Sequence, residues 1–186
     1  MNNNNQICPW WMGYALLIPL RKLGQNPYKI LGPHINSGMT VMDYGSAMGY
    51  FSLPMAKMTG NNGKVYCVDI QQKMLEKLNK RARNARLDHV IEPLLVGDTY
   101  KPAELVNQVD FTLLFAVAHE VPDKDILFQD IYKVTKSGGK VLFAEPSGHV
   151  TIQSFQQSLK IAQEAGFSLS ESKPMPNGLS ALFEKK

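Results

Sequence analysis

Histidine and carboxylate side chains gather in two short stretches of this 186-residue chain, and each stretch follows an apolar run. The first contains His119 beside Glu120, and the second contains Glu145 and His149. Imidazole and carboxylate groups that face one another can remove a proton from a bound molecule or orient that molecule. We therefore take His119 and Glu145 as the candidate catalytic residues.

The same side chains permit two other interpretations. His119, Glu145 and His149 could bind a metal ion, because imidazole and carboxylate are common ligands. Their spacing matches no metal-binding motif, so we expect no metal. Glu120 could instead interact favourably with the dipole at the start of a helix.

A glycine-rich turn, Asp43-Tyr44-Gly45-Ser46-Ala47-Met48-Gly49, follows the first apolar run. Glycine lacks a side chain, so the backbone can approach a ligand closely, and the helix expected after the turn begins with unpaired N–H groups. A dinucleotide-binding turn needs glycine at its first, third and sixth positions. Here the later two positions hold Ala47 and Tyr50, so the fit to a nicotinamide dinucleotide site is poor.

Carboxylates also follow the next two apolar runs. Asp69 lies twenty residues after Gly49, where a carboxylate can accept hydrogen bonds from both hydroxyls of a ribose. Gly97-Asp98-Thr99 follow the third run, and a group there can accept from an adenine amino group. Alternatively, this stretch caps a helix before Pro102. Behind the glycine-rich turn, these residues indicate an adenosine-type ligand.

These residues need a scaffold that brings the ends of several strands together. From residue 39 onward, strand patterns and helix patterns alternate, which predicts a parallel sheet with helices on both faces. The expected strands are 39–43, 64–69, 90–96, 109–116, 140–144, 168–172 and 179–183, and the expected helices are 48–58, 72–85, 123–135 and 151–165. A short loop joins the last two strands, which should form an antiparallel hairpin at the sheet edge.

In an open sheet of this type, ligands bind at the carboxyl ends of the strands, where the strand order reverses. The two strands that end near Ala116 and Ala144 should be neighbours. The loops that carry His119 and Glu145 should therefore converge.

The order of these motifs resembles that of class I S-adenosylmethionine-dependent methyltransferases over residues 28–186. The glycine-rich turn, Asp69, Gly97-Asp98 and the stretch 134–140 match the successive motifs of that family in order and spacing. The resemblance implies an α/β fold with a Rossmann-like, doubly wound, seven-stranded sheet, mostly parallel, and S-adenosylmethionine as the cofactor. The chain is similar to the small-molecule group that includes quinone-biosynthesis methyltransferases.

The resemblance also implies the roles of single residues. The backbone from Tyr44 to Ala47 would hold the methionine part of the cofactor, Asp69 would bind the ribose, and Ile70 would pack on the adenine. Asp98 would meet the adenine amino group, and His119 would face the transferred methyl group. The full cofactor-binding set implied is Asp43, Tyr44, Gly45, Ser46, Ala47, Gly49, Asp69, Ile70, Gly97, Asp98, Thr99 and Ala116, the last lining the methionine side.

The chain departs from the pattern of the family in two places. Ala47 stands where the family has the middle glycine of the turn, which is a mild change. The Asn/Asp-Pro-Pro-Tyr/Phe motif of methyltransferases that act on amino groups of DNA bases is absent, and the corresponding stretch is 116–121. The second departure argues against methylation of nucleobase amino groups.

Aromatic residues gather ahead of the first expected strand. The cluster consists of Trp10, Trp11, Tyr14 and Tyr28. In this fold class the segment before the first strand often covers the acceptor pocket, and aromatic rings can stack on a flat or apolar acceptor. We therefore expect residues 1–36 to form a lid segment on a methyltransferase domain at 37–186, all within one domain. Packing of these rings against the sheet is the alternative.

The apolar run from Trp10 to Leu20 has the length of a signal peptide. No basic segment precedes it, Arg21-Lys22 follow it instead, and it is too short to span a bilayer. Contact with a membrane surface is the less favoured reading. We expect no stable membrane insertion.

Composition sets the remaining limits. A hydrophobic fraction of 44% with 19% charged residues is typical of a globular protein. The net charge of +4 is mild, and no basic block dominates, so nucleic acid is not an expected partner. The two cysteines, Cys8 and Cys67, give neither a disulfide framework nor a zinc motif, in keeping with a cytoplasmic location.

The sequence therefore predicts an enzyme that transfers a methyl group from S-adenosylmethionine to a small-molecule acceptor, as a monomer or homodimer. An RNA or protein methyltransferase and a non-catalytic protein that binds S-adenosylmethionine are the alternatives, and a nicotinamide enzyme is a distant fourth.

Overall fold

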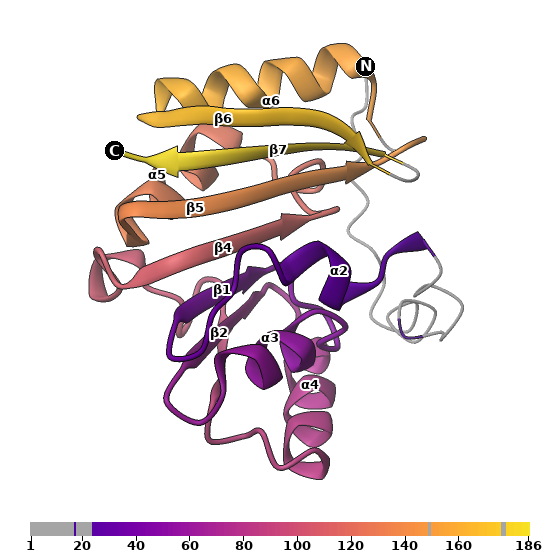
Figure 1. The fold of residues 1–186 in the computed structure, drawn as a ribbon, viewed down its shortest axis with the longest axis vertical. Helices are drawn as coiled ribbons and strands as arrows, with labels where there is room; N and C mark the ends of the chain where they lie inside the picture. The colour runs from indigo at the N-terminus through magenta and orange to yellow at the C-terminus, as the bar shows by residue number, and fades with distance from the viewer. Residues whose placement is uncertain (1–16, 18–23, 149, 176–177) are drawn as a thin grey trace.

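A computed structural model describes residues 17, 24–148, 150–175 and 178–186 of the chain. Seven strands form one sheet in the order β3-β2-β1-β4-β5-β7-β6 (Figure 1). The pairs among β1 to β5 are parallel, and β7 runs antiparallel to both of its neighbours. The strands are β1 (Thr40–Tyr44), β2 (Lys64–Asp69), β3 (Ile91–Leu95), β4 (Val109–Phe115), β5 (Thr135–Pro146), β6 (Phe167–Met175) and β7 (Gly178–Lys185).

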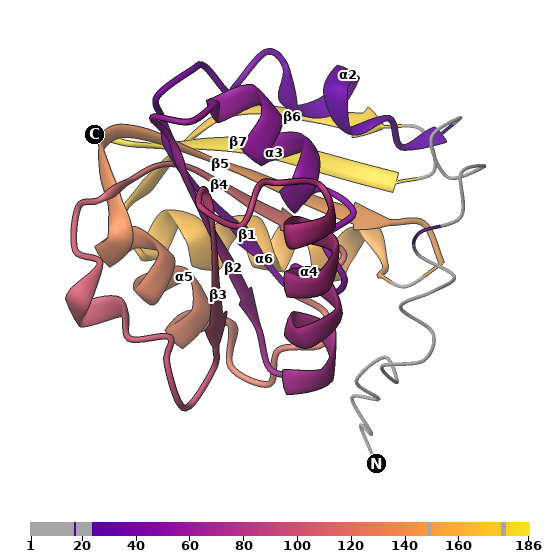
Figure 2. The ribbon, with the colours of Figure 1, turned by 90° about the horizontal axis from the view of Figure 1, so that it is seen from below.

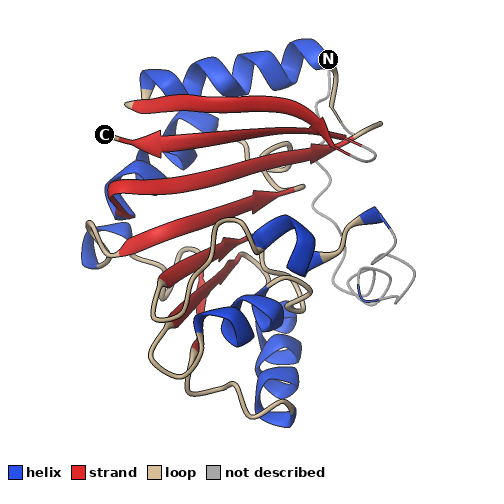
Figure 3. Ribbon diagram, in the orientation of Figure 1, coloured by secondary structure: helices blue, strands red, loops and turns tan. Residues whose placement is uncertain are grey.

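Helices cover both faces of this sheet, and from β1 to α6 they alternate with the strands (Figure 3). One face carries α2, α3 and α4, and the other carries α5 and α6, as the view in Figure 2 shows. The described helices are α2 (Pro27–Leu31), α3 (Ser52–Thr59), α4 (Gln72–Asn84), the 3-10 turn η2 (Pro102–Glu104), α5 (Lys124–Val134) and α6 (Ile152–Glu164). The expected doubly wound α/β architecture is therefore confirmed.

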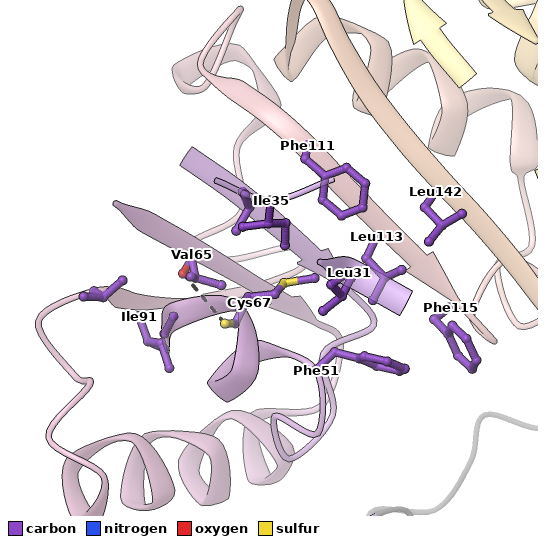
Figure 4. Packing of buried hydrophobic residues seen from close by; sticks show 14 of the residues in the cluster. Leu31, Ile35, Phe51, Val65, Cys67, Ile91, Phe111, Leu113, Phe115 and Leu142 are labelled. Carbon is purple, nitrogen blue, oxygen red and sulfur yellow. Dashed lines mark hydrogen bonds between the residues drawn. The ribbon is translucent and has the colours of Figure 1, made fainter. Parts of the chain in front are cut away.

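The alternation of side chains along the central strands divides the core into two layers. Val41 and Cys67 belong to the cluster that also contains Met55 and Ala56 of α3, part of which is drawn in Figure 4. The next residues along each strand, Met42 and Val68, belong to a cluster on the opposite face. All four strand residues are buried. Burial on both faces explains why these strands read as continuous apolar runs.

Side-chain caps fix the starts of the two longest helices on the second face. The Asp123 carboxylate accepts a hydrogen bond from the backbone N–H of Ile126 at 2.9 Å. The Thr151 hydroxyl accepts one from the N–H of Ser154 at 3.0 Å. Such caps satisfy N–H groups that the helix leaves unpaired. The helices expected at 123–135 and 151–165 therefore form as predicted, with their first residues as caps.

Two elements begin about four or five residues away from the position that the sequence predicts. The helix expected from residue 48 begins at Ser52, because Ala47 and Gly49 take positive φ angles of 45° and 80°, which a right-handed helix excludes. The strand expected from residue 140 begins at Thr135, directly after α5. Thr135 pairs with Val109, and a register shift follows before Phe111 pairs with Lys140. Long-range pairing decides this boundary.

The expected C-terminal hairpin is confirmed. Met175 pairs with Gly178, so the hairpin is longer than the sequence pattern indicated. The outer strand β6 forms the edge of the sheet, and β7 lies between β6 and β5.

A buried lysine fastens the end of the hairpin to the second layer. The Nζ atom of Lys185 donates to the Tyr132 carbonyl at 2.7 Å, to the Thr135 carbonyl at 2.8 Å and to Asn107 Oδ1 at 2.9 Å. It also lies 4.3 Å from the ring centre of Tyr132. One ammonium group thus joins β7, the end of α5 and the start of β5.

Replacing this lysine should destabilise the whole domain. We expect Lys185→Ala to lower the free energy of unfolding by about 2 kcal/mol, because three acceptors lose a charged donor. Lys186→Ala, at the neighbouring exposed position, should leave stability unchanged. Denaturant unfolding of the two variants and the wild type tests this, and equal stability of all three would contradict it.

Candidate functional site

The strand order reverses between β1 and β4, which lie side by side at the centre of the sheet. The loop after β1 leads to α3 on one face, and the loop after β4 leads to α5 on the other (Figures 1 and 2). The two loops diverge from the carboxyl edge at this point. Open α/β sheets bind their ligands in such a crevice.

The loop after β1 is held by backbone hydrogen bonds. The N–H groups of Gly45 and Ser46 both donate to the Val68 carbonyl, at 2.8 and 3.0 Å. The φ angles of Gly45, Ala47 and Gly49 are 78°, 45° and 80°. Three of the five residues from 45 to 49 are therefore left-handed, and they turn the chain sharply away from the strand. A left-handed alanine costs about 1 kcal/mol or more, so its surroundings must hold it there.

The glycines of this loop also permit close packing. A Cβ atom on Gly45 would lie 2.5 Å from the Cγ2 atom of Val117, which belongs to the loop after β4. A Cβ atom on Gly49 would lie 2.8 Å from Leu53 and 3.1 Å from Leu78. The two divergent loops therefore touch, and Gly45 sits where they meet.

The Asp69 carboxylate is the side chain that organises this loop. It is buried at the end of β2 and accepts the Ala47 N–H on Oδ2 at 2.9 Å and the Gln71 N–H on Oδ1 at 2.8 Å. Burial raises the pKa of Asp69, and these backbone hydrogen bonds oppose that shift. Each carboxylate oxygen has a second lone pair. Asp69 can therefore hold the loop and still accept two hydroxyl donors.

Two further groups test whether the loop fits a polar ligand. The Ser46 hydroxyl is buried and has no hydrogen-bond partner among the described residues. A buried hydroxyl in this state is costly, and a polar ligand atom would satisfy it. The Asp43 carboxylate is buried and accepts a hydrogen bond from the Ser52 hydroxyl at 2.5 Å, which joins β1 to the start of α3. The loop thus fits a bound polar group.

The remaining cofactor candidates lie along the same edge. Ile70, directly after Asp69, is 50% exposed, which is unusual for a large apolar side chain and suits a flat ring packed on it. Tyr44 packs edge-on against Tyr100 at 5.7 Å, and burial raises its pKa to about 12, so its hydroxyl stays protonated. Ala116 takes a φ of 57° at the end of β4, where the chain leaves the sheet.

The loop after β3 is exposed. The Thr99 hydroxyl accepts the Leu95 N–H at 2.6 Å and closes the turn that contains Gly97 and Asp98. Asp98 and Thr99 line a cavity of about 290 Å³ with residues of α4. The alternative reading of this stretch as a helix cap is wrong, because the cap of the short helix η2 is Lys101.

The structure brings His119 and Glu145 together, as expected from neighbouring strands. The ring Nδ1 of His119 lies 2.7 Å from Glu145 Oε2, and the backbone N–H of His119 donates to Oε1 at 3.1 Å. Glu145 is only 2% exposed, whereas His119 is partly open. One buried carboxylate thus fixes both the backbone and the ring of the histidine, whose Nε2 is directed away from Glu145.

The charge on this pair follows from its surroundings. The hydrogen bond that the His119 ring donates to Glu145 raises the pKa of His119, burial opposes that rise, and the Glu145 and Glu120 charges add to it. The Nε2 atom lies 4.0 Å from Glu120 Oε1. Since α5 is capped by Asp123, Glu120 belongs to the turn before the helix and faces the histidine.

Several other predictions are only partly covered by the described residues. His149, Cys8 and three members of the aromatic cluster, Trp10, Trp11 and Tyr14, lie outside them. Among residues 17, 24–148, 150–175 and 178–186, no group of three or more histidine, cysteine or acidic side chains could hold a metal ion. Tyr28, the fourth aromatic residue, is 49% exposed on α2. No helix in this part of the chain is long and apolar enough to cross a membrane.

Sequence reasoning missed three participants in this site. Val117 packs against Gly45, Gln71 donates its backbone N–H to Asp69, and Arg81 donates to the Met48 carbonyl. The first two contacts depend on the conformation of the loops, which no sequence pattern predicts. Arg81 lies in the third turn of α4, and this position brings it to the loop.

Comparison with known proteins agrees with the fold and the site described above. A family model described as a methyltransferase domain matches residues 35–175. The demethylmenaquinone methyltransferase of Lactobacillus johnsonii is 29% identical over 135 residues, which cover 73% of this chain and 53% of that protein. A ubiquinone/menaquinone biosynthesis C-methyltransferase of Haemophilus ducreyi is 28% identical over 60% of this chain and 42% of its own length. The chain spans about half the length of the curated relatives it matches.

A solved structure agrees over nearly the whole fold. An S-adenosylmethionine-dependent methyltransferase from Aquifex aeolicus superimposes with a TM-score of 0.84, covering 96% of this chain and 98% of that one at 22% sequence identity. At this identity the likeness establishes the fold.

The His119–Glu145 contact predicts a distinctive titration. In histidine-labelled protein followed by NMR, the His119 ring should titrate above its ordinary value of 6.5. In Glu145→Gln it should titrate below that value, because the raising partner is lost and burial remains. His119→Gln assigns the signal. An unchanged titration in Glu145→Gln would contradict the pairing.

The same shift fixes the sign of a stability effect. Because the pKa of His119 is higher in the folded protein than the ordinary 6.5, the pair stabilises fully below that pH and loses this contribution as the pH rises through the folded-state value. The wild type and Glu145→Gln should therefore differ most in unfolding free energy at low pH. The pH-dependent part of this difference should become smaller as the pH rises from 6.5 through the folded-state pKa of His119. A difference that grows with pH would contradict the assignment.

Proposed function

This chain belongs to the methyltransferase domain family, and from that premise we propose that it transfers a methyl group from S-adenosylmethionine to a small-molecule acceptor. The observation that carries the proposal is the loop after β1. It combines three left-handed residues, the buried Ser46 hydroxyl, which has no partner in the described part of the chain, and the Asp69 carboxylate at its side.

The cofactor assignment rests on the groups that line this edge. The carboxylate of Asp69 would accept the two ribose hydroxyls, and Ile70 would cover one face of the adenine. The exposed turn at 97–99 would meet the adenine amino group. The backbone of the loop from Tyr44 to Gly49 and the half-buried Ala116 would face the methionine part. Asp43 would act through Ser52, by holding the loop in place.

The class of acceptor is suggested by the relatives. Two of them carry names that place them in quinone biosynthesis. A reduced quinone is a flat ring with weakly acidic hydroxyl groups. We propose such a ring as the first acceptor class to test, with 1,4-naphthohydroquinone as the probe. Residues 1–36 would form the lid over it, and the protein would act in the cytoplasm as a monomer or homodimer.

His119 would act as the base in this reaction. Held by the loop after β1, S-adenosylmethionine would supply an electrophilic methyl group with a neutral thioether as the leaving group. Nε2 of His119 would take the hydroxyl proton of the acceptor, so that the electron pair of the oxygen, relayed to a ring carbon, forms the new carbon–carbon bond. The proton on that carbon would then pass to solvent, the electron pair would return to the oxygen, and the proton on Nε2 would return to that oxygen. Glu145 would keep Nε2 aimed at the acceptor.

Calorimetric titration with S-adenosylmethionine tests the cofactor site. We expect Asp69→Ala to weaken binding by about tenfold to a hundredfold, because it removes a charged acceptor. Gly45→Ala should weaken it by about tenfold or more, because its Cβ would collide with Val117. Gly38→Ala is the matched control, since Gly38 has a φ of 83° with open space around it. Wild-type affinity in Asp69→Ala would remove the adenosine-site argument.

The pH dependence of turnover tests the base. With 1,4-naphthohydroquinone, kcat should rise with pH through the raised pKa of His119, because only the neutral imidazole accepts a proton. In Glu145→Gln the rise should move to lower pH and reach a lower plateau. His119→Gln should lose about 10²- to 10⁴-fold, whereas His89→Gln, exposed on a remote loop, should not change kcat.

The rival functions give different results in the same assays. A non-catalytic binding protein would bind S-adenosylmethionine and turn over no acceptor. An RNA methyltransferase would bind RNA with an affinity that falls steeply with salt concentration. Methylation of 1,4-naphthohydroquinone at a rate lost in His119→Gln would favour the small-molecule enzyme.

A further inference from the structure

A second cavity lies among helices α2, α3 and α4. Its volume is about 240 Å³, and its lining includes Tyr28, Tyr50, Pro54, Lys57 and Arg81. None of its lining residues belongs to the cofactor set or to the His119–Glu145 pair. Drug-sized sites occupy roughly 300–1,000 Å³, so this cavity suits a smaller molecule.

The cavity carries positive charge without a balancing carboxylate. Arg81 is half-buried, and burial lowers its pKa. Among the described residues its guanidinium makes one hydrogen bond, to the Met48 carbonyl oxygen. Neither Arg81 nor Lys57 forms an ion pair within the described part of the chain. A guanidinium has five N–H donors, so most of them remain for an anion.

The rest of the lining is apolar and aromatic. The Tyr50 hydroxyl donates to the Gln25 carbonyl at 2.7 Å, which helps to fix the position of its ring. Tyr28 lines the cavity from α2 and is partly exposed, and Pro54 lines it from α3. Rigid rings of this kind suit a flat aromatic body. The cations would meet the charged end of such a ligand.

Arg81 also connects this cavity to the loop after β1. Met48, whose carbonyl accepts the guanidinium, lies between the left-handed residues Ala47 and Gly49. An anion bound to the remaining N–H donors of Arg81 would pull the guanidinium toward the cavity and weaken its hydrogen bond to the Met48 carbonyl. Occupation of the cavity would then change the stability of the loop conformation.

We propose that this cavity binds a small aromatic molecule with one anionic group, a carboxylate or a phosphate, and that Arg81 couples its occupancy to the loop. The binding site stands independently of the proposed function, whereas the effect on S-adenosylmethionine rests on it. Binding of the anion should lower the affinity for S-adenosylmethionine, because the loop loses a hydrogen bond.

Calorimetry with benzoate, phenyl phosphate and benzamide tests the site. Either anion should bind the wild-type protein, and neutral benzamide should bind about tenfold more weakly or not at all. The anion that binds with the lower Kd identifies the preferred charged group.

Variants of the lining locate the site. Arg81→Ala should weaken binding of the preferred anion by about tenfold, and Lys57→Ala, at an exposed position that leaves the fold intact, by about threefold. Arg83→Ala is the matched control, because Arg83 is exposed on the same helix and does not line the cavity. No binding of either anion, equal binding of benzamide, or wild-type affinity in both Arg81→Ala and Lys57→Ala would overturn the proposal.

A second titration tests the coupling. With the preferred anion at saturation, the Kd for S-adenosylmethionine should rise about threefold or more in the wild type and stay unchanged in Arg81→Ala. By linkage, S-adenosylmethionine should raise the Kd of the anion by the same factor. An unchanged Kd in the wild type would overturn the coupling. If S-adenosylmethionine binds in neither state, the proposed function fails, and the anion titrations still decide the site.

Discussion

The carboxylate of Asp69 joins the end of β2 to the loop after β1, and the geometry of the candidate site depends on that contact. It accepts the N–H of Ala47, a residue held at a positive φ that alanine seldom takes. Without this acceptor, the strain at Ala47 would favour another path for the loop. The loop in turn brings Gly45 against Val117, so one buried carboxylate sets how the two loops at the switch point meet.

The reacting end of the site depends on a second buried carboxylate. Parallel pairing of β4 with β5 places His119 and Glu145 at the same edge of the sheet. There Glu145 accepts hydrogen bonds from both the ring and the backbone N–H of the histidine. A glutamate that is 2% exposed needs such a partner, because an unpaired buried charge is costly. The pairing therefore stabilises the edge and leaves Nε2 on the side of the ring away from Glu145.

Much of this could be predicted from the sequence, because strand alternation and turn residues carry local signals. The convergence of His119 and Glu145 followed from expecting neighbouring strands. The start of β5 at Thr135 could not be predicted, since it depends on pairing with Val109. The contact of Arg81 with Met48 was missed as well, because a cationic helix face reads as solvent-exposed whatever lies beside it. The sequence pattern indicates the elements, and three-dimensional packing decides the contacts between loops.

The central claim is that the Asp69 loop holds S-adenosylmethionine with its methyl group toward His119. A crystal structure of the protein with S-adenosylmethionine tests this most directly. We expect both Asp69 oxygens to accept ribose hydroxyls and Nε2 of His119 to face the sulfonium methyl across the space for an acceptor. A cofactor bound without contact to Asp69, or a methyl group remote from His119 and Glu145, would contradict the account.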